Sequence, residues 1–213
     1  MDKGVIIIGA GGHAKVVVST LIAANIKIGG IFDDDPDKWG KTILGVKIIG
    51  SLSGIDRDST EQALIAVGDN KTRKDIAGRF PHLRWITIVH PDAYVHPSVH
   101  LGKGTAVFAK AVIQPDTSVG DHCIVNTGAT IDHDCQIDNY VHFSPGVNLA
   151  GGVRLGEGVF CGIGGKAITG VTVGKWTTIG AGGVIINDLP EYSLAVGVPA
   201  KVTDRIKKYK DDK

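Results

Sequence analysis

The segment TIDHDCQIDNYVHF, residues 130–143, holds side chains suited to proton transfer or metal binding. His133 lies between Asp132 and Asp134, and His142 follows nine residues after His133. A histidine beside a carboxylate is suited to act as a general base, whereas several histidines and acids together are suited to bind a metal. The same residues would also suit a solvated turn. Nothing within the segment decides between these interpretations, so the periodicity around it has to.

A six-residue period surrounds this segment. Every sixth residue from Val95 to Ile185 is apolar, and each residue four positions later, from Val99 to Gly183, is small or β-branched. A helix would need a period near 3.6 and a simple strand a period of 2. A hexapeptide period is typical of a parallel β-helix, in which three units close a triangular coil of about eighteen residues. We expect the three cysteines to pack inside this prism, and turn glycines such as Gly102 and Gly120 to supply positive φ angles.

The coil length predicts which polar residues are neighbours. His133 and Gly151 are eighteen residues apart, so they should occupy equivalent positions on adjacent coils, about 5 Å apart. A histidine base and a backbone N–H at that separation could flank one reacting carbonyl group. His142 lies half a coil from His133 and should project from another side of the prism. If the two histidines share a site, we infer that His142 comes from a neighbouring subunit.

Residues 1–85 indicate a small parallel α/β domain, because apolar strands alternate with helical segments. Gly9, Gly11 and Ala14 match G-x-G-x-x-A, and the acidic residues 33–35 follow about twenty positions later, as in nucleotide-binding folds. The domain is about half the size of a dinucleotide-binding fold, which favours a mononucleotide over NAD. The alternative is that the glycines only allow the first strand and helix to pack closely.

Composition excludes several classes of function. The formal net charge of +1 gives no electrostatic basis for binding nucleic acid or an anionic membrane. No apolar stretch approaches the roughly 18 residues of a membrane span, and the first apolar run begins too early for a signal peptide. The three cysteines lack close-pair spacing, so neither a disulfide framework nor a zinc clip is expected. We therefore expect a cytoplasmic protein.

The combination of motifs resembles a known family. GAGGHA, DDD and AVGDNKTR, followed by HPDAYVHPSV and a prism carrying NTGATIDHD, are similar to the bacterial sugar acyltransferases of the sialic acid O-acetyltransferase type. Within these, the chain looks closest to the N-acetyltransferases of nucleotide-linked 4-amino-4,6-dideoxy sugars. The resemblance runs from IIIGAGGHA to GVPAKV. It implies a half-Rossmann-like α/β domain over 1–85 and a left-handed β-helix over 86–213 that ends in a strand and a helix. It also implies a homotrimer with active sites between prisms.

The resemblance also implies roles for individual residues. His133 would be the general base, and Asp134, which is glutamate in some relatives, would orient it. Asn126 would hold the sugar near its amino group. The nucleotide would lie against Gly12, His13, Asp33, Asp34, Gly68 and Asn70. Acetyl-CoA would lie against His142, Gly151, Ile163, Gly180, Ala181, Pro199 and Lys201, with no metal required.

The expected function is transfer of acetyl from acetyl-CoA to the amine of a nucleotide-linked amino sugar in surface-glycan biosynthesis. Three alternatives remain at this point: O-acetylation of a sialic acid or another hydroxyl, non-catalytic binding of a nucleotide sugar, and zinc-dependent hydration of carbon dioxide. The zinc alternative needs three histidines at one place. It is poorly supported, because His122 falls at a different corner of the triangular coil from His133 and His142. The sequence leaves open whether the nucleotide is UDP, dTDP or GDP.

Overall fold

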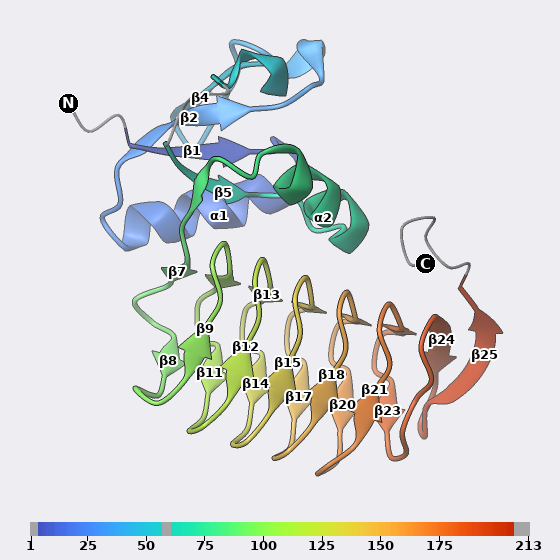
Figure 1. The fold of residues 1–213 in the computed structure, drawn as a ribbon. Coiled ribbons are helices and arrows are strands. Elements are labelled where there is room, and N and C mark those ends of the chain that lie inside the picture. Colours follow the sequence, from blue (N-terminus) through green and yellow to red (C-terminus); the bar gives the residue numbers. More distant parts are fainter. Residues whose placement is uncertain (1–3, 57–60, 207–213) are drawn as a thin grey trace.

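The computed structural model describes residues 4–56 and 61–206 as an α/β domain that lies over one face of a long prism (Figure 1). The α/β domain is built on a six-stranded sheet of order β3-β4-β2-β1-β5-β6. All neighbouring strands run parallel except β3 and β4. The strands are β1 (Val5–Ile8), β2 (Ile28–Phe32), β3 (Thr42–Ile43), β4 (Val46–Gly50), β5 (Gln62–Ile65) and β6 (Arg84–Trp85).

Two helices cover opposite faces of this sheet. α1 (Gly12–Ala23) packs with Val5 and Ile7, whereas α2 (Asn70–Arg79) packs with Ile6 and Ile8. The connections after β1 and β5 therefore diverge at the carboxyl ends of adjacent strands, which is where open α/β sheets bind ligands. Two short 3₁₀ helices follow the strands that lie on the side of β1 away from β5: η1 (Pro36–Lys38) comes after β2, and η2 (Leu52–Gly54) comes after β4.

The prism consists of three sheets of short parallel strands, and stacked strands pair residues eighteen positions apart, as in Ala106 with Ile124. The first face contains β7 (Ile88–Val89), β10 (Ala106–Val107), β13 (Ile124–Val125), β16 (His142–Phe143), β19 (Phe160–Cys161), β22 (Thr178–Ile179) and β24 (Ser193–Val196), with β25 (Lys201–Arg205) antiparallel to β24. The second face contains β8 (Tyr94–Val95), β11 (Val112–Ile113), β14 (Thr130–Ile131), β17 (Asn148–Leu149), β20 (Lys166–Ala167) and β23 (Val184–Ile185). The third face contains β9 (His100–Leu101), β12 (Ser118–Val119), β15 (Gln136–Ile137), β18 (Arg154–Leu155) and β21 (Thr172–Val173).

Three edges separate these faces. The first edge consists of the turns from the first face to the second, such as 126–129. The second edge consists of the turns from the second face to the third, such as 132–135 and 150–153. The third edge consists of the turns from the third face back to the first, such as 138–141. The predicted hexapeptide β-helix and the α/β domain are both confirmed.

Both apolar columns of the hexapeptide repeat fill the prism. Phe143 and Val141, one from each column, are fully buried. Cys123, Cys135 and Cys161 are buried among them as predicted. Burial raises the pKa of the Cys123 and Cys161 thiols to about 12, so these thiols stay protonated and unreactive.

The role predicted for the turn glycines is wrong. Positive φ angles of 53–75° recur every six residues from Gly104 to Gly182, two positions after the glycines that were expected to adopt them. At Gly120 the constraint is steric, because an added Cβ would lie 2.5 Å from the side-chain oxygen of Asn139 on the next coil. Glycine here permits close stacking of coils rather than a left-handed backbone.

The chain passes from the α/β sheet to the prism between Trp85 and Ile88. At the other end, β24 continues the first face and β25 turns back along it. The predicted C-terminal helix falls beyond Ile206, outside the described residues. Within the described ranges, neither α1 nor α2 has the length and apolar content needed to cross a membrane.

Candidate active site

His133 lies on the second edge with an acid on one side of its ring. Its Nδ1 is 2.7 Å from Asp134 Oδ2, and both side chains are more than half exposed. Because an ionised carboxylate only accepts hydrogen bonds, the proton belongs on Nδ1 and Nε2 carries the lone pair. The hydrogen bond that His133 donates to Asp134, and next the charge of Asp132, raise the pKa of His133. The ring can therefore accept a proton at Nε2.

Gly151 lies directly against the His133 ring. A Cβ added to Gly151 would lie 2.5 Å from His133 Cε1 and 2.7 Å from Nε2, so only glycine leaves room for the imidazole. The next residue, Gly152, donates its N–H to the carbonyl of His133 at 2.9 Å. Within residues 4–56 and 61–206, the N–H of Gly151 donates no hydrogen bond. A base and a free backbone donor therefore lie side by side, as the coil length predicts.

His142 lies on the first face, beneath the α/β domain. Its Nδ1 is 3.0 Å from the carbonyl oxygen of Gly68, and its Nε2 is 3.4 Å from Asn126 Nδ2. The ring also contacts Phe160 edge-on and lies 6.0 Å from the ring of His13. Burial, and next the charge of Arg73, lower the pKa of His142 to about 4, so it is neutral. Within one chain, His133 and His142 are thus on different sides of the prism, as expected.

The residues predicted to bind acetyl-CoA divide between two edges. Gly151 is on the second edge, whereas Ile163, Gly180 and Ala181 follow the first edge, where Asn126 also lies. Pro199 lies in the turn between β24 and β25, where the Val198–Pro199 peptide is cis, and Lys201 is the first residue of β25. The two edges flank the second face, which carries an open groove lined by Asn148, Leu149, Ala150, Lys166, Ala167, Ile168, Thr169 and Val184.

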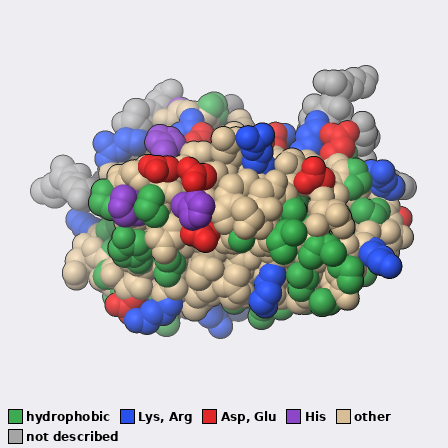
Figure 2. Space-filling model, turned by 90° about the horizontal axis from the view of Figure 1, so that it is seen from below, with side chains coloured by type: hydrophobic (Ala, Val, Ile, Leu, Met, Phe, Trp, Pro, Cys, Tyr) green, Lys and Arg blue, Asp and Glu red, His purple; other side chains and the backbone are tan. Residues whose placement is uncertain are grey.

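Seen from below, the prism shows two kinds of surface (Figure 2). Histidine and acidic side chains gather toward its N-terminal half, beside a group of hydrophobic side chains, and further hydrophobic side chains gather toward its C-terminal half. Exposed apolar residues of the C-terminal half include Ile163, Ile168, Ile186, Val198 and Val202. The polar second edge around His133 therefore adjoins an apolar region on the same molecule.

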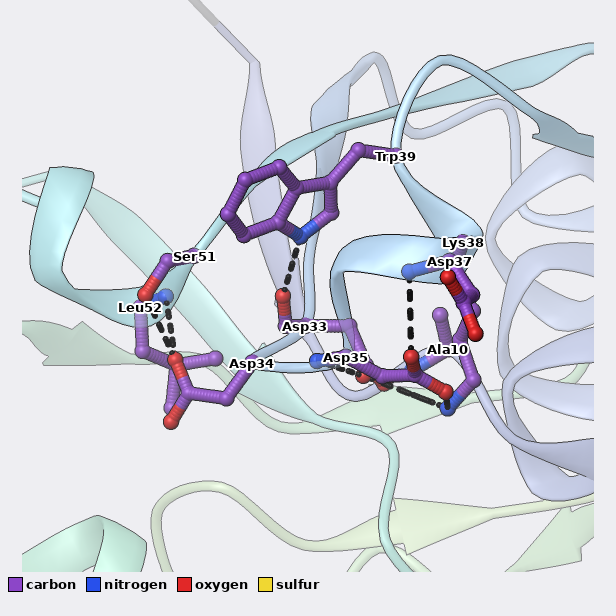
Figure 3. A network of polar contacts seen from close by, with 9 residues as sticks. All are labelled: Ala10, Asp33, Asp34, Asp35, Asp37, Lys38, Trp39, Ser51 and Leu52. Atoms are coloured by element: carbon purple, nitrogen blue, oxygen red, sulfur yellow. Dashed lines mark hydrogen bonds and ion pairs between the residues drawn. The ribbon is translucent and has the colours of Figure 1, made fainter.

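Asp33 and Asp34 lie at the carboxyl end of β2 in a network of polar contacts (Figure 3). Asp33 accepts the backbone N–H of Ala10 at 2.6 Å and pairs with Lys38 at 3.2 Å, which ties the glycine loop to β2. Asp34 accepts from Ser51 Oγ at 2.7 Å, and this hydrogen bond is the largest cause of its lowered pKa. Both acids line a cavity of about 330 Å³ together with Ile8, Gly9, Leu52, Val67, Thr72, Asp75, Ile76 and Arg79.

The remaining predicted nucleotide residues lie where α1 and α2 begin. Gly12 is exposed at the start of α1, and Gly11 before it makes no side-chain cap. His13 packs edge-on against Phe108 of the prism, and burial lowers its pKa to about 4. Gly68 and Asn70 line a second cavity of about 350 Å³ with His142, Phe160 and Trp176, between α2 and the first face. Gly68, His13 and His142 are thus brought together.

Asn70 has a different environment from the one expected of a ligand contact. Its Nδ2 donates to the carbonyls of Gly158 at 3.0 Å and Val159 at 3.2 Å, both on the prism. Its side-chain oxygen accepts from Arg73. Sequence reasoning missed Arg73, which is 1% exposed. The only available signal for Arg73 was its position one helical turn after Asn70 in GDNKTR.

The described residues contain no group of three or more His, Cys, Asp or Glu side chains that could hold a metal ion.

Three comparisons relate this chain to known proteins. Residues 4–80 match the family described as the PglD N-terminal domain. PerB from Caulobacter crescentus, solved with CoA and GDP-perosamine, is 42% identical, with 94% of this chain and 97% of that chain covered and a TM-score of 0.89. Two further structures of that enzyme, with one histidine replaced by asparagine or alanine, hold the same two ligands.

The acetyltransferase domain of PglB from Neisseria gonorrhoeae, solved with acetyl coenzyme A, is 38% identical, with 93% of this chain and 98% of that chain covered and a TM-score of 0.86. The UDP-N-acetylbacillosamine N-acetyltransferase of Bacillus subtilis is 38% identical over 118 residues, which are 50% of this chain and 52% of that protein. The chain spans 21% and 52% of the length of the curated relatives that it matches.

Proposed function

Because this chain belongs to the sugar acyltransferases of the hexapeptide-repeat family, with their left-handed β-helix, we propose that it transfers acetyl from acetyl-CoA to the amine of a nucleotide-linked amino sugar. The observation that carries this proposal is that His133 pairs with the Asp134 carboxylate and lies directly against Gly151, whose backbone N–H donates no hydrogen bond within the described residues. CoA and a nucleotide-linked amino sugar bound together in the Caulobacter relative support the two substrates.

The chemistry needs a base and an oxyanion donor. The amine nitrogen attacks the thioester carbonyl carbon while Nε2 of His133 accepts a proton from that nitrogen. The carbonyl oxygen becomes negative in the tetrahedral intermediate, and the N–H of Gly151 stabilises it. When the intermediate collapses, the carbon–sulfur bond breaks, and His133 returns the proton to the departing thiolate of CoA. Asp134 keeps Nδ1 protonated, so that Nε2 remains the accepting atom.

The nucleotide half of the substrate would bind at the carboxyl ends of β1, β2 and β5. Backbone N–H groups at the start of α1, beside Gly12 and His13, suit a diphosphate. The cavity beside Asp33 and Asp34 is then left for the nucleoside. The roles of Gly68 and Asn70 in nucleotide binding, and of Asn126 in holding the sugar, remain predictions. Such substrates agree with the predicted cytoplasmic location and with a role in surface-glycan biosynthesis.

We further propose that the active site is completed by a second copy of the chain in a homotrimer. His133 and Gly151 would come from the second edge of one prism, and Asn126 and His142 from the first edge and first face of its neighbour. The division of the predicted residues between edges supports this, as does the exposed apolar surface beside them. The acetyl-CoA contacts proposed for Ile163, Gly180, Ala181, Pro199 and Lys201 would then follow the groove between the two prisms.

A thiol-release assay tests the proposal. Acetyl-CoA would be supplied with UDP-, dTDP- and GDP-linked 4-amino and 3-amino sugars, and separately with a sialic acid. We expect CoA to be released with at least one nucleotide-linked amino sugar and not with the corresponding 4-hydroxy sugar. Release with sialic acid alone would indicate O-acetylation, and tight binding of a nucleotide sugar without release would indicate a binding protein.

A further inference from the structure

Helix α2 is attached to the third edge of the prism through polar contacts. Asn70 donates to the carbonyls of Gly158 and Val159, as described above, and Lys74 pairs with Glu157 at 2.7 Å. These contacts join the α/β domain to the prism close to the loop 67–69. This loop both follows β5 and contacts His142, so its position couples the two halves of the proposed site.

Arg73 is the central residue of this attachment. Its Nε donates to the carbonyl of His122 at 2.7 Å and its Nη2 to that of Tyr140 at 2.8 Å, on two successive prism coils. Nη1 donates to the carbonyls of Val67 and Gly68, each at 3.1 Å, and Nη2 donates also to Asn70 Oδ1 at 2.9 Å. All five N–H groups of the guanidinium are therefore used, in a geometry that the single nitrogen of a lysine cannot reproduce.

The carbonyl oxygen of Gly68 is shared between Arg73 and His142. Since a carbonyl only accepts hydrogen bonds, His142 must carry its proton on Nδ1, and the neutral ring then presents a lone pair at Nε2. The backbone N–H of Thr127 donates to Asn126 Oδ1 at 2.9 Å, which turns the Asn126 amide nitrogen toward that lone pair. One hydrogen-bonded chain thus runs from Arg73 through Gly68 and His142 to Asn126.

We propose that Arg73 is a positioning residue for acyl transfer: through the Gly68 carbonyl it holds His142 as the neutral Nδ1–H tautomer, in register with Asn126. This inference rests on the proposed function, in which His142 and Asn126 contact the substrates. The buried guanidinium also carries its charge close to His142, which adds to burial in disfavouring an imidazolium there. Arg73 touches neither substrate in this scheme.

A double-mutant cycle tests the inference. Arg73→Lys should lower kcat/KM about tenfold or more, because the Gly68 carbonyl loses the arginine donor that fixes its position. In a His142→Gln background the same change should cost less than about twofold, since the residue through which Arg73 acts is gone. Lys74→Ala is the matched control, because it breaks another contact of α2 with the prism but none with Gly68, and it should change kcat/KM by less than about twofold. Equal losses from Arg73→Lys in both backgrounds would overturn the inference.

A second measurement needs no Arg73 variant. In wild-type protein labelled with ¹⁵N-histidine, the ring nitrogens of His142, assigned by their loss in His142→Gln, should show a neutral ring with the proton on Nδ1 from about pH 7 to about pH 5. An Nε2–H tautomer or an imidazolium would contradict the inference even if the variants fail to fold. A wild type that shows this tautomer but releases no thiol contradicts the proposed function alone, whereas an active wild type with equal losses in the cycle contradicts the inference alone.

Discussion

His133 differs from three other histidines of the chain in its environment. It is exposed and its pKa is raised by Asp134, whereas burial lowers the pKa of His13, His122 and His142 to about 4. A general base must meet the substrate and exchange a proton with it near the working pH. Among these four, His133 is the one that is exposed and lies directly against a residue, Gly151, whose backbone N–H is unoccupied in the described part of the chain.

The pH dependence of kcat/KM should change in Asp134→Asn. A base works in its unprotonated form, so activity is lost as the pH falls through the pKa of His133, which lies above its ordinary value of about 6.5. Asn removes the largest cause of that rise, so the acidic midpoint should move to lower pH. Asp116, one coil earlier on the same edge, is the control, and Asp116→Asn should leave the midpoint in place. A midpoint that stays or rises in Asp134→Asn would contradict the assignment of the base.

Single residues were predictable where the repeat determines their neighbours. The spacing of His133 and Gly151 places them on adjacent coils, and the structure brings them into contact. Arg73 was not predictable, because its partners at His122 and Tyr140 are 49 and 67 residues away in another domain. A local sequence pattern does not predict a contact between side chains of two different domains. The same holds for Asn70, whose donors reach the prism.

At the scale of the element, the hexapeptide unit is predictable through its two inward columns but not through its turn. The inward positions require apolar or small side chains, so the sequence marks them clearly. The left-handed position accepts glycine but also Lys110, His122, Tyr140 and Trp176, so residue type does not mark it. The turn conformation follows from the stacking of coils and overrides the preference of each residue.

Replacing a left-handed turn residue by glycine should therefore increase the free energy of unfolding. Lys110 has a φ of 62° and an exposed ion pair with Asp92, so Lys110→Gly should raise the free energy of unfolding by about 1 kcal/mol through relief of the left-handed backbone. Lys103→Gly, just before the left-handed Gly104, should instead lower it by about 0.5–1 kcal/mol. Denaturant unfolding of both variants measures this, and equal effects of the two changes would contradict the account of the turn.

At the scale of the whole molecule, several neutral histidines lie where the α/β domain meets the prism. His13 packs against Phe108, and His122 packs between Trp85 and Tyr140. The contacts of His13 with Phe108 and of His122 with Trp85 cross between the α/β domain and the prism. The position of the nucleotide site relative to the prism therefore depends on an interface that disfavours charge on its histidines.

That interface predicts how stability depends on pH. His13, His122 and His142 have pKa values of about 4 when folded, against about 6.5 when unfolded. Between these values the unfolded chain binds more protons, so stability falls as the pH falls. We expect the melting temperature to drop from about pH 7 to about pH 5, and to drop less in His122→Phe. A melting temperature that rises over this range would contradict the buried, neutral state of these rings.

Mixed trimers test the sharing of the site between subunits. His133→Ala and His142→Ala chains, each impaired alone, should regain part of the activity when they are co-assembled, because some interfaces then combine an intact His133 with an intact His142. Thiol release from mixed and unmixed preparations measures this. No recovery in verified mixed trimers would contradict the proposed sharing of the site between subunits.

The central claim is that His133 is the base, and the turnover of His133→Ala tests it most directly. With saturating acetyl-CoA and the nucleotide-linked amino sugar found by the thiol-release assay, we predict a loss of about 10²–10⁴ in kcat. The Kd for the sugar nucleotide, measured on the same preparation, should change little, because the ring binds neither the nucleotide nor CoA in this account. A kcat within about twofold of wild type would contradict the account.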